Sequence, residues 1–466
     1  MPNAKSANIA KCSISDSTAT CVVDFYTTNS CDYGSYIGES YARNTGSSCV
    51  SGALRTRAPF SYSTKRSDKR IASRVTVASV VSVHWAVEPG PSGAEVTRII
   101  SDGAYSFSVE DIAGICGYDG AQGVFVGHLG VQTADPLKNQ LLPFVRNSLN
   151  QIRLSSSQDS FPEQMVQGAI IKGFLALDDS IIKAASDTAQ SSTLSLHEKV
   201  KKLAPAYSGS CALLSLFDPS TSTLHVACTG DSRAVLGQTG PDGTWKAVPL
   251  SVDQTGNNQD EVMRLQKEHP GEDDIVKNGR VLGIMVSRAF GDCQWKWPME
   301  FQKEMQRQFY GPILNPKYNF QSPPYLTAEP VVTSTKIDPA SPSFLILATD
   351  GLWDLVSNRQ AVDLVGKWLE MQAGAAEKKG VNKLEPTNEP FDFGHFWNGV
   401  SWKFEEGRTT VQDDNVAMHL VRNALGGNHH ELISGRLAFD SLASRRVRDD
   451  ITVQVVFFDA PLLKDR

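Results

Sequence analysis

Short apolar runs recur along this chain, and several of them end at a glycine or at an acidic residue. The clearest covers residues 344–348, where an apolar run of strand length leads into Asp350 and Gly351. Runs of the same kind predict strands at residues 75–87, 104–109, 123–126, 209–217, 224–229, 233–236 and 451–458. Helical periodicity predicts helices at residues 135–149, 161–185, 257–269, 357–372 and 414–425.

Two local patterns refine this prediction. In the helix predicted at residues 161–185, the spacing of four apolar residues predicts a buried face. These residues are Met165, Ile170, Phe174 and Ile181. Residues 229–232, Thr-Gly-Asp-Ser, predict a tight turn between two strands.

The first hundred residues differ from the rest of the chain. They are rich in Ser, Thr, Gly and Asn without a steady period, so we predict an irregular N-terminal region at 1–100. Within it, residues 41–74 carry eight basic residues and a single acid, Asp68, as a targeting segment would; a solvated tail is the alternative. We expect one globular domain at 101–466 with an inserted loop at 373–412, where no period is found.

Composition excludes several classes of function. The net charge of -6 argues against nucleic acid as the main partner, because phosphate binding needs a basic excess. No apolar run approaches the roughly 20 residues of a membrane helix, so no membrane span is expected. The eight cysteines include no Cys-x-x-Cys pair and no zinc-ligand spacing, so no zinc site is expected. Four of them lie in the first fifty residues, as in an oxidised module, but the other four are scattered through apolar segments and no secretory signal is found, which favours a reduced compartment.

Four acids flank the predicted strands, and they are the candidate chemistry. They are Asp231, Asp350, Asp354 and Asp449. Antiparallel strands can bring such ends to one edge of a sheet, where carboxylates repel unless cations or protons neutralise them. Two Mg²⁺ or Mn²⁺ ions roughly 3.5–4 Å apart would clamp a phosphoryl group and activate water. The alternative is that Asp350 starts a turn and Asp354 caps a helix.

The ordered motifs resemble those of the protein phosphatase 2C family of metal-dependent serine/threonine phosphatases. The resemblance covers residues 102–459 and rests on residues 110–111, 123–130, 209–212, 229–236, 287–292, 348–354 and 448–453. It implies an α+β fold in which a central sandwich of two antiparallel β-sheets is flanked by helices. It also implies that the metals lie in a cleft at one end of the sandwich.

The resemblance assigns roles residue by residue. Asp350 and Asp449 resemble direct metal ligands, and the carbonyl of Gly127 resembles a backbone ligand. Asp231 and Asp354 resemble acids that, with Asp350, hold a third, weaker ion.

Other positions of the motifs contact the metals only through water or not at all. Glu110 and Asp111 resemble partners of the metal-bound waters. The attacking group would be such a water, so no side-chain nucleophile is implied. Ser232, Ser287 and Cys211 are therefore interpreted as turn or core residues.

One motif departs from the family. Where the family has Phe-Asp-Gly-His-Gly-Gly, residues 125–130 read Phe-Val-Gly-His-Leu-Gly, so Val126 replaces the acid that bridges both catalytic metals. An arginine that many relatives place four residues before the acidic pair is replaced by Ser106. Two functions stay open: a phosphoserine/phosphothreonine phosphatase weakened by Val126, or a catalytically impaired relative that acts as a regulatory binding module. A degraded gene copy is a third possibility.

A branch of the family narrows the expected substrate. Residues 250–255, 264–271, 327–332 and 419–427 resemble the fungal type of mitochondrial pyruvate dehydrogenase phosphatase. The implied partner is a phosphoprotein, the pyruvate dehydrogenase complex, and the implied location is the mitochondrial matrix, with the cytoplasm as the alternative.

Overall fold

The computed structural model describes residues 121–152, 161–372, 374, 387, 389–396, 402–438 and 447–458 in full. Residues 153, 154 and 397 and the strands before residue 121 are described as backbone only. Glu110, Asp111 and the basic stretch at 45–74 lie outside the described residues. The region predicted to be irregular contains the strands β1 (Asn8–Ser15), β2 (Thr18–Thr27), β3 (Ser35–Asn44), β4 (Val75–Ser79), β5 (Val87–Pro89) and β6 (Glu95–Thr97).

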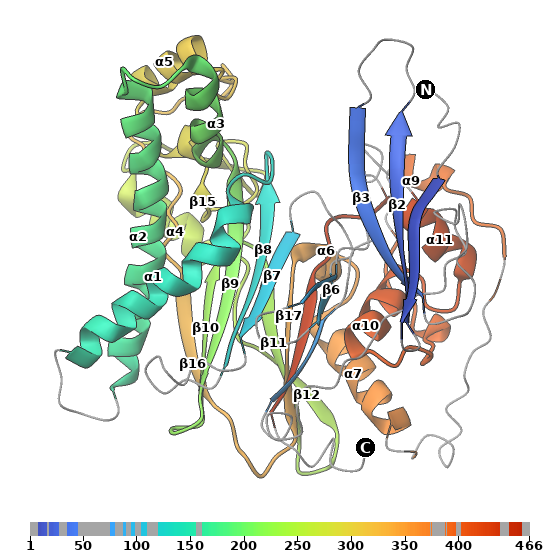
Figure 1. Ribbon diagram of the computed structural model, residues 1–466. Coiled ribbons are helices and arrows are strands. Elements are labelled where there is room, and N and C mark those ends of the chain that lie inside the picture. Colours follow the sequence, from blue (N-terminus) through green and yellow to red (C-terminus); the bar gives the residue numbers. More distant parts are fainter. Residues whose placement is uncertain are drawn as a thin grey trace.

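Two antiparallel sheets form the centre of the molecule (Figure 1). The first has the order β16-β10-β9-β8-β7, and β15 also pairs with β9. Its strands are β7 (Ala104–Val109), β8 (Gly120–His128), β9 (Gly209–Asp218), β10 (Thr223–Thr229), β15 (Phe290–Gly291) and β16 (Val331–Lys336). The second has the order β12-β11-β17-β18-β4. Its further strands are β11 (Arg233–Thr239), β12 (Trp245–Pro249), β17 (Ser343–Ala348) and β18 (Val453–Phe458).

Helices cover the outer face of each sheet. The first sheet packs against α1 (Ala134–Leu154) and α2 (Glu163–Gln190), with Phe125 and Phe174 both fully buried in that layer. The second packs against α7 (Asn358–Gln372) and α10 (Val416–Leu425). Between the sheets lies a third apolar layer that includes Val124, Leu236 and Leu347. The predicted sandwich of two antiparallel sheets flanked by helices is therefore confirmed.

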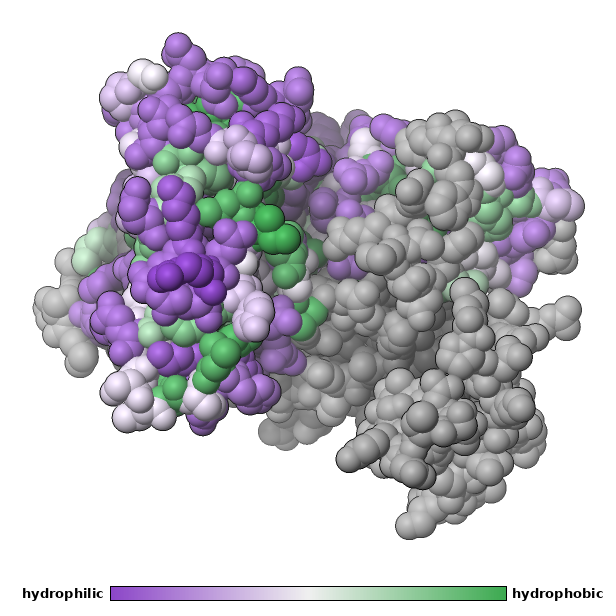
Figure 2. All heavy atoms as spheres, turned by 90° about the horizontal axis from the view of Figure 1, so that it is seen from above, coloured by the Kyte–Doolittle hydropathy of each residue, from purple (hydrophilic) through white to green (hydrophobic). Residues whose placement is uncertain are grey.

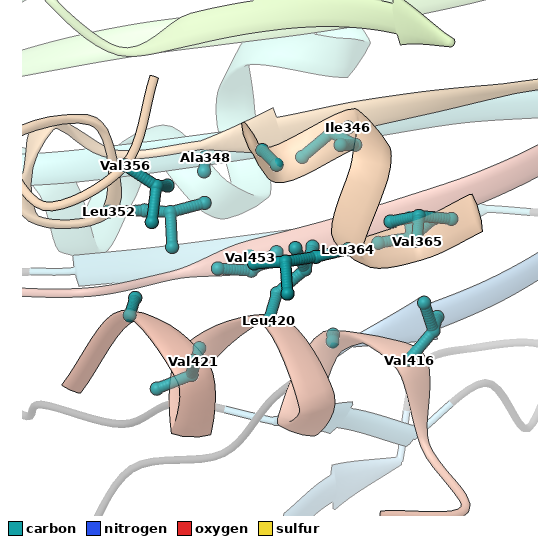
Figure 3. Packing of buried hydrophobic residues seen from close by; sticks show 14 of the residues in the cluster. Ile346, Ala348, Leu352, Val356, Leu364, Val365, Val416, Leu420, Val421 and Val453 are labelled. Atoms are coloured by element: carbon teal, nitrogen blue, oxygen red, sulfur yellow. The ribbon is translucent and has the colours of Figure 1, made fainter. Parts of the chain in front are cut away.

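The layer under the second sheet shows why β17 and β18 are held firmly. In Figure 3, Leu420 of α10 points toward Val453 of β18, Val421 lies further along the same helix, and Leu364 and Val365 come from α7. Each of these side chains is at least 97% removed from solvent. Burying one such side chain stabilises the fold by roughly 1.5–3 kcal/mol, so the ends of these strands are well anchored.

The remaining elements extend the sandwich. They are α3 (Leu196–Tyr207), α4 (Gln259–Glu268), β13 (Val276–Lys277), β14 (Arg280–Val281), η1 (Cys293–Trp295), α5 (Met299–Phe309), α6 (Asp350–Trp353), α9 (Gly394–Trp397), η2 (Glu406–Arg408) and α11 (His430–Ala438). The last part of the predicted insert is thus ordered locally around α9 and η2. No helix among the described residues is long and apolar enough to cross a bilayer. The described cysteines Cys211, Cys228 and Cys293 are free and buried.

Two local predictions need correction. Met165 is 41% exposed, so it does not share the buried face of α2 with Ile170 and Phe174. The turn at 229–232 does join two strands, but β10 and β11 belong to different sheets, so no hairpin forms. Gly230 adopts φ +106°, and a Cβ there would collide with the thiol of Cys211, so glycine is required where the chain crosses between sheets.

Candidate active site

Three strand ends of the second sheet meet at one edge. Arg233, the first residue of β11, pairs with Ala348, the last residue of β17. Ala348 in turn pairs with Val453 at the start of β18. Because β17 is antiparallel to both neighbours, the residues before β11 and β18 and the residues after β17 all emerge on the same side. Figure 2 looks down on the molecule from above, the end toward which β8 points in Figure 1, where hydrophilic residues dominate the described surface.

The four predicted acids lie at this edge, and we call them the acid rim. Asp231 precedes β11, Asp350 opens α6 directly after β17, Asp354 caps the end of α6, and Asp449 precedes β18. The hydroxyl of Thr349 donates to the carbonyl of the residue after Asp449 at 2.7 Å. The sheet therefore delivers acids from three separate parts of the sequence to one neighbourhood.

Asp350 is the most crowded carboxyl of the acid rim. Its pKa is raised well above the ordinary value, first by burial and then by the charges of Asp231, Asp449 and Asp354. The N–H of Gly351 donates to its Oδ1 at 3.0 Å, which opposes the shift. Part of Asp350 still reaches solvent, so this charge is open to a ligand.

The outer members of the rim are held by different partners. Burial raises the pKa of Asp231, and the thiol of Cys211 opposes this by donating to its Oδ1 at 3.3 Å. Partial burial raises the pKa of Asp354 as well, followed by the charges of Asp449 and Asp253, while Arg233 lowers it. The rim is thus negatively charged and only partly compensated.

Val126 faces this edge from the first sheet. It pairs across the strands with Cys211, and cross-strand partners project from the same face of a sheet. The thiol of Cys211 reaches Asp231, so Val126 is one side chain removed from the acid rim. Val126 is 8% exposed and packs in an apolar cluster with Cys211 and Leu282. A carboxylate at position 126 would add to the rim, whereas valine offers no oxygen.

The described part of the chain contains no group of three or more His, Cys, Asp or Glu side chains arranged to hold one metal ion. The acids of the rim are therefore neighbours that do not converge on one point. Their chemistry nevertheless fits a hard divalent cation, because carboxylate oxygens are the ligands that Mg²⁺ and Mn²⁺ prefer. The raised pKa of Asp350 reports the negative charge that such a cation would neutralise. Val126 is the position that does not fit.

A histidine and an aspartate that the sequence did not single out lie at the same edge. The Nε2 of His128, the last residue of β8, is 2.5 Å from Oδ2 of Asp292. Asp292 is fully buried and left-handed, with φ +51°, and it follows Gly291, which has φ +69°. Glycine adopts positive φ readily, but a non-glycine residue such as Asp292 does so at a cost and needs support from its surroundings.

That support comes from α2. Oδ1 of Asp178 accepts the N–H of Gly291 at 2.9 Å, and its Oδ2 accepts from Lys296 at 2.6 Å. Burial raises the pKa of Asp178 despite the opposing charge of Lys296. The helix that the sequence predicted to be only core thus also holds the segment carrying Asp292. Sequence motifs contained His128 and Asp292, but nothing local connected two residues 164 positions apart.

Other predicted positions fall in three groups. Gly127 lies in β8 next to His128, where Ser210 pairs with it across the strands. Ser232 and Ser287 are fully buried, and the latter donates to Glu261 at 2.7 Å. β7, which precedes Glu110 and Asp111, ends with Val109 paired to Ala121. The roles given to Glu110 and Asp111 stay predictions.

Comparison with known proteins agrees with the motifs. The family model described as Protein phosphatase 2C matches residues 118–386, which include Val126, Asp231, Asp350 and Asp354. A protein phosphatase 2C homolog of Schizosaccharomyces pombe is 41% identical over 344 residues, covering 73% of this chain and 74% of that protein.

Several relatives carry a more specific name, mitochondrial pyruvate dehydrogenase (acetyl-transferring) phosphatase 1, among them a yeast and a human protein. The Saccharomyces cerevisiae protein is 37% identical over 357 residues, which are 72% of this chain and 61% of that protein. The human protein is 35% identical over 312 residues, which are 63% of this chain and 55% of that protein. The chain therefore spans less than two thirds of the length of either protein.

Proposed function

This chain belongs to the protein phosphatase 2C family of metal-dependent serine/threonine phosphatases, and on that premise we propose that it dephosphorylates a mitochondrial phosphoprotein slowly. The observation that carries the proposal is the acid rim, where the pKa of Asp350 is raised by burial and by three neighbouring acids. Such a site needs cations to work, and the family uses Mg²⁺ or Mn²⁺. The slow turnover follows from Val126.

We assign the cation ligands within the acid rim. Asp350 and Asp449, with the carbonyl of Gly127, would hold the two principal ions, and Asp231 and Asp354 would hold a third, weaker one with Asp350. Bound cations supply charge neutralisation and polarisation of the phosphoryl group. Without a carboxylate at position 126, we expect weaker binding of the principal pair.

The side chains around the rim support hydrolysis without a protein nucleophile. Ser232, Ser287 and Cys211 are at least 98% buried, so none of them can reach a phosphopeptide. Burial also raises the pKa of the Cys211 thiol well above its ordinary value, which keeps it protonated as a donor to Asp231. Asp292 fixes the ring of His128 at the edge of the site.

The proposed substrate is phosphorylated pyruvate dehydrogenase. The names of the yeast and human relatives support this, as does the resemblance of residues 250–255 and 419–427 to the pyruvate dehydrogenase phosphatase branch. The same names support a mitochondrial location, within which we propose the matrix. Imaging a tagged full-length protein tests the location, and a purely cytosolic signal would contradict it.

A regulatory binding module is the second candidate function, and Val126 together with the lack of a converged ligand group among the described residues favours it. Purified protein should be incubated with Mn²⁺ and phosphorylated pyruvate dehydrogenase, with an unrelated phosphoprotein as control. Release of phosphate that EDTA abolishes supports the phosphatase. Stable binding of the phosphoprotein without any release would identify the binding module instead.

A further inference from the structure

Within the insert, partly buried and exposed side chains alternate along residues 402–404. Trp402 is partly buried in an aromatic cluster, with its ring 5.9 Å from that of Phe391. Phe404 packs against the core under the second sheet, and its N–H donates to the carbonyl of Leu355 at 3.1 Å. Lys403, between these two anchors, is exposed. Trp402 and Phe404 therefore fix the position from which the Lys403 side chain extends into solvent.

That place is the outer edge of the acid rim. Leu355, which accepts from the residue after Lys403, directly follows Asp354. Lys403 is also close enough to lower the pKa of Asp354, although burial dominates that group and raises its pKa. The insert thus carries a cation to the outer margin of the four acids.

The other described cation that acts on Asp354 is already engaged. Arg233 donates from Nε and Nη2 to both oxygens of Asp253, at 2.8 and 2.5 Å, and from Nη1 to Asn358 at 2.8 Å. Its guanidinium also lies over the ring of Trp353 at 5.3 Å. Lys403 has no hydrogen-bond or ion-pair partner among the described residues, so its ammonium group is available to a ligand.

We propose that Lys403 is a specificity-determining residue that binds an anionic oxygen of the phosphopeptide at the outer edge of the acid rim. The proposal rests on the proposed phosphatase function. A phosphopeptide brings about two negative charges to an edge that already carries four carboxyls, so approach is opposed wherever cations do not compensate. Lys403 offers compensation beside Asp354, at the outer margin of the acid rim.

Two sources can supply the anionic oxygen: the phosphate itself and a carboxylate flanking the phosphoserine. Both would accept a charge-assisted hydrogen bond from the lysine. They are separated by comparing a phosphopeptide whose flanking residues are acidic with one whose flanking residues are alanine. A loss of binding shared by both peptides identifies the phosphate, and a loss confined to the acidic peptide identifies the carboxylate.

The test is equilibrium binding of both fluorescent phosphopeptides, measured by anisotropy with Mn²⁺ at about 50 and 200 mM salt. We expect Lys403→Met to weaken binding of the acidic peptide about three- to tenfold and to reduce its salt dependence. Lys403→Arg should retain binding. Lys367→Met is the matched control, since that lysine already pairs with Glu406 at 3.5 Å.

The proposal is overturned if Lys403→Met binds both peptides as tightly as the wild type, or if the wild type binds neither. Phosphate release is measured in parallel on the same samples. Binding that depends on Lys403 without any release would reject the phosphatase function and leave the lysine contact standing. Release by the wild type that is equally efficient in Lys403→Met, with unchanged KM, would reject the lysine contact alone.

Discussion

Val126 and Cys211 are cross-strand partners in β8 and β9, and the thiol of Cys211 donates to Asp231 of the acid rim. Position 126, where the family motif has an acid, therefore lies beside the thiol that donates to Asp231. It also shows how valine is accommodated, because the side chain joins an apolar cluster and leaves the strand intact. The fold therefore tolerates valine at position 126, whereas metal binding and catalysis should be weakened by it.

Removing a charge from the acid rim should stabilise the metal-free protein. The raised pKa of Asp350 means that its ionised form is disfavoured in the folded chain, so stability from this group is lost as pH rises. Asp350→Asn should raise the free energy of unfolding in EDTA by about 1 kcal/mol or more. The variant is measured by denaturant titration at neutral pH, with Asp363→Asn on the surface of α7 as the control.

Bound Mn²⁺ should stabilise the wild type more than it stabilises the Asp350→Asn variant. Mn²⁺ at a hundred times its Kd stabilises a one-site protein by about 2.7 kcal/mol, so the wild type should gain thermal stability in Mn²⁺. Asp350→Asn should lose most of that gain. A wild-type melting curve that is identical in Mn²⁺ and EDTA would contradict the assignment of cations to the rim.

Gly209 leaves no room for a side chain between His128 and Asp292. A Cβ at this position would collide with Oδ2 of Asp292 and Nε2 of His128. Gly209→Ala should therefore destabilise the protein by about 1–3 kcal/mol and lower its activity. The control is Gly168→Ala in α2, where a Cβ meets nothing within 4 Å and should stabilise by about 0.5–1 kcal/mol. Equal melting temperatures for the two variants would show that the space at Gly209 is not restricted.

His419 should make stability depend on pH. Its Nε2 donates to the carbonyl of Leu364 at 3.0 Å, its Nδ1 accepts from Asn423 at 3.2 Å, and burial lowers its pKa to about 4. Between the unfolded pKa of 6.5 and about 4, the unfolded chain binds a proton that the folded chain excludes. The free energy of unfolding should therefore decrease as the pH is lowered through that window, by up to ~1.4 kcal/mol per pH unit from this group.

The corresponding variant is His419→Gln, in which that contribution to the slope disappears even if the protein is less stable at pH 7. The control is His430→Gln, since His430 is exposed at the start of α11. Denaturant titrations at pH 7, 6 and 5 measure the slope. A slope that is unchanged in His419→Gln would mean that His419 is protonated equally in both states.

The sequence pattern predicted those helices and strands whose positions depend on consecutive residues alone. The apolar run before Asp350 predicted β17, and the helix predicted at residues 414–425 ends at Leu425 as α10 does, just before Gly426. Strand burial and helix ends depend on consecutive residues, so local pattern can predict them. The turn at Gly230 was recognised, but its two strands join different sheets, and that depends on pairing with β9 and β17 far along the chain.

Contacts between distant residues had no such local signal. His128 and Asp292 meet only because β15 pairs with the start of β9, and Asp178 reaches Gly291 from another layer. Lys403 lies in a stretch without periodicity, so its place beside Asp354 follows from the anchoring of Trp402 and Phe404 rather than from any motif. The metal ligands themselves were suggested by family motifs and remain assigned by them.

The central claim is that Val126 limits an otherwise competent site, and Val126→Asp tests it most directly. Valine and aspartate are similar in size, so the substitution should fit. The loss of a bridging carboxylate should raise the activation barrier by several kcal/mol, and each ~1.4 kcal/mol lowers the rate tenfold. The measurement is Mn²⁺-dependent kcat/KM on a phosphoserine peptide for wild type, Val126→Asp and the uncharged control Val126→Asn. We predict an increase of at least about a hundredfold for the aspartate variant alone. Equal activity of wild type and Val126→Asp, or a folded Val126→Asp protein that stays inert with Mn²⁺, would contradict the account.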